Sequence, residues 1–135
     1  MNKTGSKFNI INIVKQMIYS NEVSNMDLVG NVNGCDCIII DDMIDTAKTI
    51  CSAAELLHQN GAKRIFGFAS HGIFSGKAIE NINSSKLNRV IVTNTIPLDR
   101  TKESPKIVQL SVGNLIAETI RRINNNESLS ENFKY

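Results

Sequence analysis

The stretch that decides the fold class is "DCIIIDDMIDTAKT", residues 36–49. Its apolar run, Cys37 to Ile40, shows no polar alternation, which is typical of a strand buried on both faces of a parallel sheet. Acids and hydroxyls follow, and apolar residues with helical spacing then continue until Gly61, a residue type that often ends helices. Residues 36–60 are therefore predicted to form a strand, a polar loop and a helix.

The same alternation continues toward the C-terminus. Apolar runs predict strands at 65–69 and 90–92, with a short helix at 75–84 between them. An edge strand is predicted at 107–110, followed by a last helix whose apolar face carries Leu115, Ile116, Ile120 and Ile123. Strands that alternate with helices indicate right-handed crossovers, so the predicted fold class is α/β with a parallel sheet.

The N-terminal region has a different pattern. Apolar residues between Ile10 and Ile18 recur at intervals of three and four, which predicts a helix despite their β-branched content. Residues 23–32 are interpreted as a connector. No repeat or second domain is evident, so residues 1–135 are taken as a single domain, with a divergent extension at 1–24 and a polar tail at 124–135.

Composition excludes several classes of protein. The chain has 135 residues, of which 41% are hydrophobic and 21% charged, a composition typical of globular proteins. Its net charge of +2 is far below that of a nucleic-acid binder with a basic stripe on one face. No stretch has the length or apolarity of a membrane span or a secretory signal, so no membrane partner and a cytoplasmic location are expected. Cys35, Cys37 and Cys51 form no C-x-x-C pair and are expected to be reduced thiols.

The polar segment 41–49 lies where a parallel strand ends and a helix begins, a place where open α/β sheets collect ligands. Helix amides and the hydroxyls of Thr46 and Thr49 favour an anion such as phosphate, and Lys48 could add a positive charge. Asp41 and Asp42 suit sugar hydroxyls or Mg²⁺ instead. The segment therefore predicts a pocket for a phosphorylated sugar, whereas the simpler alternative is that Asp42 or Asp45 only caps the helix.

Three blocks of sequence resemble one family in order and without large gaps. They are "CIIIDDMIDTAKTICSAAELLHQNGAKRIFGFASHGIFSGKAIENI", "VIVTNTIPL" and "IAETIRRINNNESLS". Together with Gly34 they resemble the C-terminal half of ribose-phosphate pyrophosphokinase, also called phosphoribosyl pyrophosphate synthetase, over roughly residues 25–133. The resemblance implies a type I phosphoribosyltransferase fold, a parallel-sheet sandwich in one domain.

The resemblance also implies an activity in nucleotide biosynthesis, the transfer of diphosphate from MgATP to ribose 5-phosphate, which gives phosphoribosyl pyrophosphate and AMP. It implies Mg²⁺, an oligomer, and no catalytic nucleophile. By the same resemblance, His71 could face the nucleotide, and Asp41 and Asp42 could hold the metal. The residues that would bind ribose 5-phosphate are Asp41, Asp42, Asp45, Thr46, Ala47, Lys48 and Thr49. Those that would bind allosteric ADP or phosphate are Ser128, Leu129, Ser130 and Phe133.

The chain departs from the family in three ways. Glycine normally stands at the position of Lys48, and a positive φ there would strain a side chain. The family's mobile Lys-Arg-Arg segment is replaced by residues 17–22, and the family's N-terminal half is missing, so the chain alone is expected to be incomplete for turnover. Three interpretations stay open: a separately encoded or truncated part of a synthetase, a non-catalytic regulatory relative, and a phosphoribosyl-sugar binder with another role.

Overall fold

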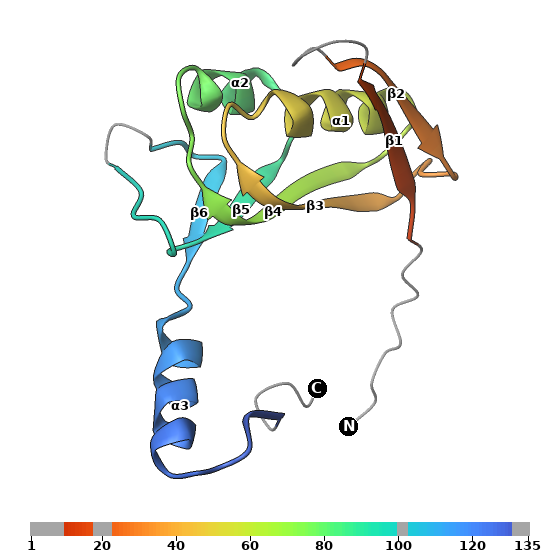
Figure 1. The fold of residues 1–135 in the computed structure, drawn as a ribbon. Helices are drawn as coiled ribbons and strands as arrows, with labels where there is room; N and C mark the ends of the chain where they lie inside the picture. The colour runs from red at the N-terminus through yellow and green to blue at the C-terminus, as the bar shows by residue number, and fades with distance from the viewer. Residues whose placement is uncertain (1–9, 18–22, 100–102, 131–135) are drawn as a thin grey trace.

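The computed structural model describes residues 10–17, 23–99 and 103–130, and Figure 1 shows their arrangement. A four-stranded sheet carries two helices on one face, and a third helix extends away from it (Figure 1). The elements in chain order are β1 (Asn12–Met17), β2 (Val23–Val29), β3 (Asp36–Ile44), α1 (Lys48–Gln59), β4 (Arg64–Gly72), α2 (Ala78–Ser84), β5 (Arg89–Thr93), β6 (Ile107–Leu110) and α3 (Gly113–Asn124).

The main sheet has the order β3-β4-β5-β6 with all neighbours parallel, which confirms the predicted α/β class and the edge strand at 107–110. Two strands are longer than predicted. β3 continues through Asp41 and Asp42 to Ile44, and β4 continues through Ser70 and His71 to Gly72. Main-chain pairing extends both strands, since Met43 pairs with His71 and Ile44 with Gly72.

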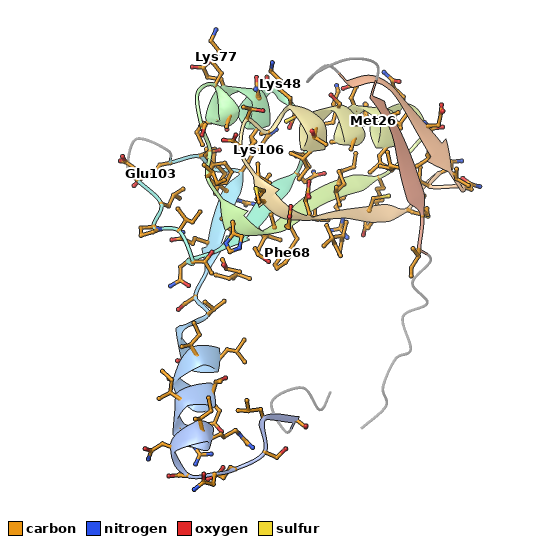
Figure 2. The ribbon with its side chains drawn as sticks, in the orientation of Figure 1. Met26, Lys48, Phe68, Lys77, Glu103 and Lys106 are labelled. Atoms are coloured by element: carbon orange, nitrogen blue, oxygen red, sulfur yellow. The ribbon has the colours of Figure 1, made fainter. Side chains whose placement is uncertain are left out.

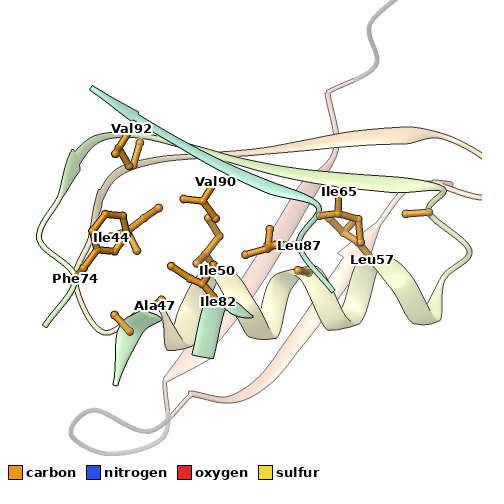
Figure 3. Packing of buried hydrophobic residues seen from close by; sticks show 14 of the residues in the cluster. Ile44, Ala47, Ile50, Leu57, Ile65, Phe74, Ile82, Leu87, Val90 and Val92 are labelled. Carbon is orange, nitrogen blue, oxygen red and sulfur yellow. The ribbon is translucent and has the colours of Figure 1, made fainter. Parts of the chain in front are cut away.

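The core lies between the sheet and the helices α1 and α2 (Figure 3). On β4 the buried positions Ile65, Gly67 and Ala69 alternate with half-buried ones, as expected for one face of a strand. A Cβ added to Gly67 would lie 2.5 Å from Cδ1 of Ile50. Glycine at this position therefore allows α1 to pack close to the sheet.

The helix predicted for Ile10 to Ile18 is wrong, and so is the connector predicted for 23–32. The structure has an antiparallel pair instead, in which β1 residues Asn12 to Met17 pair with β2 from Val29 back to Val23. Ile18 lies outside the described residues. The β-branched residues that weakened the helix prediction favour strands, and the pairing of two strands adds hydrogen bonds that helical spacing cannot reveal.

Helix α3 has no buried residue, and Figure 1 shows that it points away from the sheet. It begins after Ser111 and Val112, directly beyond the end of β6. None of the helices in the described parts of the chain is both long enough and apolar enough to cross a membrane.

All three cysteines are free thiols, as expected. Cys35 is exposed, whereas Cys37 and Cys51 are partly buried. Burial raises the pKa of the Cys37 thiol and of the Cys51 thiol above the ordinary value of 9.0. The two partly buried thiols are therefore held in the protonated form near neutral pH, which agrees with a structural role.

Candidate anion-binding site

The paired acids lie at the end of β3, and the loop between β3 and α1 is only Asp45 to Ala47. The prediction that the polar loop starts at residue 41 is therefore wrong by four residues, because β3 keeps its pairing with β4 as far as Ile44. Oδ1 of Asp41 accepts the amide N–H of Asp42 at 3.0 Å, and Oδ1 of Asp42 accepts that of Met43 at 2.8 Å. Both acids are exposed at the strand end.

Helix α1 begins without a side-chain cap. Its N-cap residue is Ala47, and no side-chain hydrogen bond caps the helix, so neither Asp42 nor Asp45 plays the capping role. Ala47 has φ 60° and ψ 5°, in the left-handed region, and its side chain is 5% exposed. The positive φ thus lies at Ala47, one residue before Lys48, and the methyl group points into the core instead of toward a ligand.

The carbonyl groups of the loop are all used inside the protein. The carbonyl oxygen of Ile44 accepts the amides of Ile73 and Phe74, at 2.9 and 3.2 Å. That of Asp45 accepts the amide of Ser75 at 3.1 Å. The carbonyl oxygen of Thr46 accepts a hydrogen bond from Nδ2 of Asn81 at 3.0 Å, and that of Ala47 accepts one from the amide of Cys51 at 3.1 Å.

The amide groups of the same peptide units are not used in this way. In a trans peptide the N–H points opposite to the C=O of the same peptide unit. Because the carbonyl groups of Asp45, Thr46 and Ala47 point toward their hydrogen-bond donors, the N–H groups of the residues that follow them point the other way. Among the described residues, the N–H groups of Thr46, Ala47 and Lys48 donate to no other residue. Successive amides in a helical and left-handed turn form a concave site for anions, and the positive end of α1 adds to it.

A pocket of about 150 Å³ lies at this loop. This volume has room for a small anion. Its charged lining residues are Asp41, Asp45 and Lys48, so two acids and one base surround it, and Asp42 is not part of the lining. The full lining is Asp41, Met43, Ile44, Asp45, Thr46, Ala47, Lys48, Thr49 and Ile50.

Lys48 is exposed and opens the first turn of α1. Figure 2 shows its side chain projecting from the helix layer on the side away from the sheet, as does that of Lys77. The backbone of Lys48 therefore contributes to the pocket more directly than its ammonium group does in this arrangement.

His71 lies near the end of β4 in a small polar cluster beside β5. Its Nδ1 is 2.8 Å from the hydroxyl of Thr95. That hydroxyl also lies 2.9 Å from the carbonyl oxygen of Ser70, which accepts the hydroxyl of Thr93 at 2.6 Å. His71 pairs with Met43 in the sheet, so its main chain is beside the strand that leads to the loop, but its side chain does not line the pocket.

The residues expected to bind a regulatory nucleotide lie beyond α3, away from the β3–α1 loop (Figure 1). The carbonyl oxygen of Ser128 accepts Nη1 of Arg122 at 2.9 Å, and the hydroxyl of Ser128 accepts the amide of Ser130 at 3.3 Å. Leu129 is 39% exposed. Phe133 lies outside the described residues.

Asn81 was not predicted as a site residue. It lies on α2, 35 residues from Thr46, and its side-chain amide bonds the Thr46 carbonyl. Nothing in the local sequence signals this role, because an asparagine on a helix surface is common and the contact depends on how α1 and α2 pack.

Comparison with known proteins places the chain in a family. The family model of the phosphoribosyl synthetase-associated domain matches residues 5–134. Ribose-phosphate pyrophosphokinase 3 of Saccharomyces cerevisiae is 49% identical over 123 residues, which cover 90% of this chain and 38% of that protein. The ribose-phosphate pyrophosphokinase of Shewanella oneidensis is 47% identical over 124 residues, covering 91% and 39%.

The fold comparison agrees. A crystal structure of phosphoribosylpyrophosphate synthetase from Mycobacterium smegmatis matches with a TM-score of 0.73 and 40% sequence identity, covering 78% of this chain and 35% of that one. The chain thus spans less than two fifths of the length of these curated relatives. With its parallel sheet and a family match over almost its whole length, the chain belongs to the phosphoribosyl synthetase-associated domain family.

Proposed function

We propose that the β3–α1 loop binds the 5-phosphate of ribose 5-phosphate. The observation that carries this proposal is the orientation of the loop peptides, whose carbonyls are bonded inward from Asp45 to Ala47 while the amides of Thr46 to Lys48 have no partner among the described residues. Asp45, Thr46 and Lys48 are exposed, so these amides are open to hydrogen-bond acceptors of a ligand, and phosphate oxygens supply several at once.

The acids beside the loop indicate which kind of phosphate would bind. Asp41 and Asp45 would repel a bare phosphate, because Lys48 is the single base among the pocket-lining residues. A sugar phosphate brings hydroxyl donors for the carboxylates, and a divalent cation would neutralise them. The charge balance of the lining therefore favours a phosphorylated sugar with Mg²⁺ over a free inorganic anion.

The residues of the pocket would hold Mg²⁺ only together with ligands from the substrate and from water. The described residues contain no group of three or more His, Cys, Asp or Glu side chains placed to hold a metal. Mg²⁺ is often bound by one or two carboxylates together with substrate phosphates and waters, and Asp41, with Asp42 beside it, could fill that part. When bound, the ion would neutralise charge on the phosphates, while Asp41 and Asp45 would orient the ribose hydroxyls.

The activity that this binding would serve is the ribose-phosphate diphosphokinase reaction, in which the diphosphoryl group of MgATP moves to the 1-hydroxyl of ribose 5-phosphate. Such a transfer depends on alignment and charge neutralisation, with no protein nucleophile. This chain would contribute the sugar-phosphate half of the site. ATP, the remaining cations and the nucleotide contacts would come from further subunits or from protein outside the 135 residues.

A second candidate is a non-catalytic regulatory subunit that associates with an active synthetase. The favouring observation is the low positive charge of the pocket, in which Lys48 points away from the sheet (Figure 2). Cations stabilise the moving phosphates in such reactions, so a site with so few is better suited to binding than to turnover.

The test is calorimetric titration of the purified chain with ribose 5-phosphate and, separately, with inorganic phosphate, each with Mg²⁺. We expect ribose 5-phosphate to bind more tightly. Asp41→Asn should weaken ribose 5-phosphate binding by roughly tenfold, as for the loss of one charged hydrogen bond, while inorganic phosphate binds as well as before or better. Asp27→Asn, at an exposed acid of β2 outside the pocket, is the matched control.

An assay of AMP release from MgATP separates the two candidates. A partner role is supported if the chain alone binds ribose 5-phosphate without releasing AMP, and if adding it to an active synthetase raises AMP release above the rate of that synthetase alone. AMP release by the chain alone supports a catalytic unit. Failure to bind either ribose 5-phosphate or inorganic phosphate overturns the proposed site.

A further inference from the structure

The start of β3 carries two cysteines that the proposed sugar-phosphate site does not use. Cys35 directly precedes the strand and Cys37 is its second residue, with Asp36 between them. Because β3 ends in the β3–α1 loop, the two thiols lie at the opposite end of the strand from that loop (Figure 1). Both thiols are free, and Cys35 is exposed whereas Cys37 is partly buried.

Hydrogen bonds hold the main chain at this pair of cysteines. A turn is closed by the amide of Cys35, which donates to the carbonyl oxygen of Val32 at 3.0 Å. Within the turn, the amide of Gly34 donates to the carbonyl oxygen of Gly61 at 2.8 Å. The carbonyl oxygen of Cys35 accepts the amide of Lys63 at 2.8 Å, which continues the pairing of β3 with β4 one residue beyond the strand. The backbone that carries both thiols is therefore held in place before any ligand binds.

The spacing of the two cysteines places both side chains on one side of the extended chain. Side chains two residues apart in a strand share a face and lie about 6.6 Å apart. Sγ of Cys37 lies 4.0 Å from the carbonyl oxygen of Cys35, and Sγ of Cys35 lies 3.6 Å from that of Asn33. Because the Cys35 side chain is exposed, its thiol is free to rotate from Asn33 toward Cys37.

This spacing suits a bridging metal ion better than a disulfide. A disulfide requires Cβ atoms about 3.5–4.5 Å apart, which two residues of extended chain do not provide. Two metal–thiolate bonds of about 2.3 Å each span roughly 4.6 Å, so each sulfur has to lean toward the other by only about 1 Å. The pair can therefore chelate one ion without a change in the backbone.

The available donors select the kind of metal. Asp36, between the cysteines, is already paired, because Oδ1 accepts Nε of Arg64 at 2.8 Å and Oδ2 accepts Nη2 of the same residue. The described residues contain no group of three or more His, Cys, Asp or Glu side chains placed to hold a metal. Zn²⁺ prefers four ligands and Mg²⁺ prefers oxygen, whereas two thiolates alone suit a soft ion such as Cu⁺.

We propose that Cys35 and Cys37 bind one soft monovalent metal ion, Cu⁺, between their two sulfurs. On binding, each thiol releases its proton to solvent and each sulfur forms one bond to the ion, whose oxidation state does not change. The bound pair carries one net negative charge, and the neighbouring Asp36 adds none because Arg64 pairs with it. Since the pair lies at the far end of β3 from the β3–α1 loop, this site is independent of sugar-phosphate binding.

The first test is titration of the reduced full chain with Cu⁺, without oxygen and in competition with a coloured Cu⁺ chelator. We expect one ion per chain. Cys35→Ser and Cys37→Ser should each weaken binding by more than about a hundredfold, since even groups that only support a metal ligand commonly contribute roughly tenfold to a hundredfold. Cys51→Ser is the matched control, because Cys51 is a partly buried free thiol like Cys37 but lies on α1. Unchanged binding in Cys35→Ser or in Cys37→Ser overturns the proposal.

The second test examines the coordination of the bound ion. X-ray absorption at the copper edge should show two sulfur neighbours, and Zn²⁺ in excess should leave the bound Cu⁺ in place. Circular dichroism of Cys35→Ser should match that of the wild-type chain, because Cys35 is exposed, so its loss of binding is not a loss of fold. Three or four sulfur neighbours, one ion per two chains, or displacement by Zn²⁺ overturns the two-thiolate site.

Discussion

The side-chain amide of Asn81 donates a hydrogen bond to the carbonyl oxygen of Thr46 across 3.0 Å, and so joins α2 to the loop that precedes α1. We expect Asn81→Ala to lower the affinity for ribose 5-phosphate about fivefold to tenfold, because one hydrogen bond of about 1 kcal/mol no longer holds the Thr46 peptide with its N–H side toward the pocket. Calorimetric titration measures the affinity, and urea denaturation measures the accompanying loss of stability.

A matched control lies on the same helix. Asn83 accepts a hydrogen bond from the hydroxyl of Ser104, at the far side of α2 from the loop. Asn83→Ala removes a comparable bond and should lower the free energy of unfolding by a similar amount, with the affinity unchanged. Equal losses of affinity in the two variants would mean that general destabilisation, and not the orientation of the Thr46 peptide, explains the effect.

The left-handed conformation at Ala47 predicts different responses to glycine at two neighbouring positions. Ala47→Gly relieves strain of about 1 kcal/mol but removes a buried methyl group, which contributes about 0.8 kcal/mol. The free energy of unfolding should therefore change by less than about 0.5 kcal/mol, the residual of those two terms. Lys48→Gly, in the first turn of α1, should instead cost about 0.5–1 kcal/mol.

Urea denaturation of both variants checks this contrast. A stabilising effect of Lys48→Gly would place the strained position at residue 48, where the family has glycine, and would contradict the φ of 60° at Ala47. The buried methyl also bears on binding, since Ala47 is 5% exposed and its side chain leaves the pocket open. Ala47→Gly should accordingly leave the affinity for ribose 5-phosphate within about twofold, a change of under 0.5 kcal/mol.

The β3–α1–β4 unit could be predicted because its signals are local. An apolar run, a helical repeat and Gly61 each act within a few residues, and the structure places α1 at Lys48–Gln59. The end of β3 could not be predicted in this way. Asp41 and Asp42 have low strand propensity, and the strand continues through them only because β4 offers main-chain partners as far as Gly72.

The N-terminal hairpin was missed for a related physical reason. Apolar spacing between Ile10 and Met17 fits a helix, but the strand that forms there is stabilised by pairing with β2, which spacing within one segment does not report. The site shows the same division. The β3–α1 loop has a local motif, whereas Asn81 reaches Thr46 only after α1 and α2 pack together.

Lys106 provides a further test, because its ammonium group bonds the end of α2. Its Nζ donates to the carbonyl oxygen of Ser85 at 2.8 Å and to that of Ile82 at 3.2 Å. We expect Lys106→Met to lower the free energy of unfolding by about 1–3 kcal/mol, since the aliphatic stem is kept while two part-buried carbonyls lose a charged donor.

Thermal and urea denaturation measure that loss, with Lys86→Met as the control. Lys86 is exposed two residues beyond the end of α2, and replacing it should change the free energy of unfolding by less than about 0.5 kcal/mol, as for an ordinary surface substitution. Similar losses in both variants would show that a general change in charge, and not the bonds to Ser85 and Ile82, sets the stability.

The charge cluster on α3 predicts a response to acid. Hydrogen bonds from Arg121, and then from Arg122, lower the pKa of Glu118 from its ordinary 4.5 to about 2. Because the pKa in the folded chain lies below the unfolded value, the stabilisation by Glu118 is fully present above pH 4.5 and is lost as the pH falls toward 2. Hydrogen bonding to Arg121 also lowers the pKa of Glu127, so both acids act in the same direction.

We therefore expect the C-terminal half of α3 to lose helical order in acid while the core helix α1 keeps its own. Carbon-13 chemical shifts of the Glu118 carboxyl and of the α3 backbone, recorded from pH 7 to pH 2, measure both events. Glu118→Gln should remove most of this pH dependence, because glutamine does not ionise, and Glu55→Gln on α1 should not. If the α3 shifts titrate near the ordinary 4.5 in the wild-type chain, the bonds from Arg121 and Arg122 to Glu118 do not persist in solution.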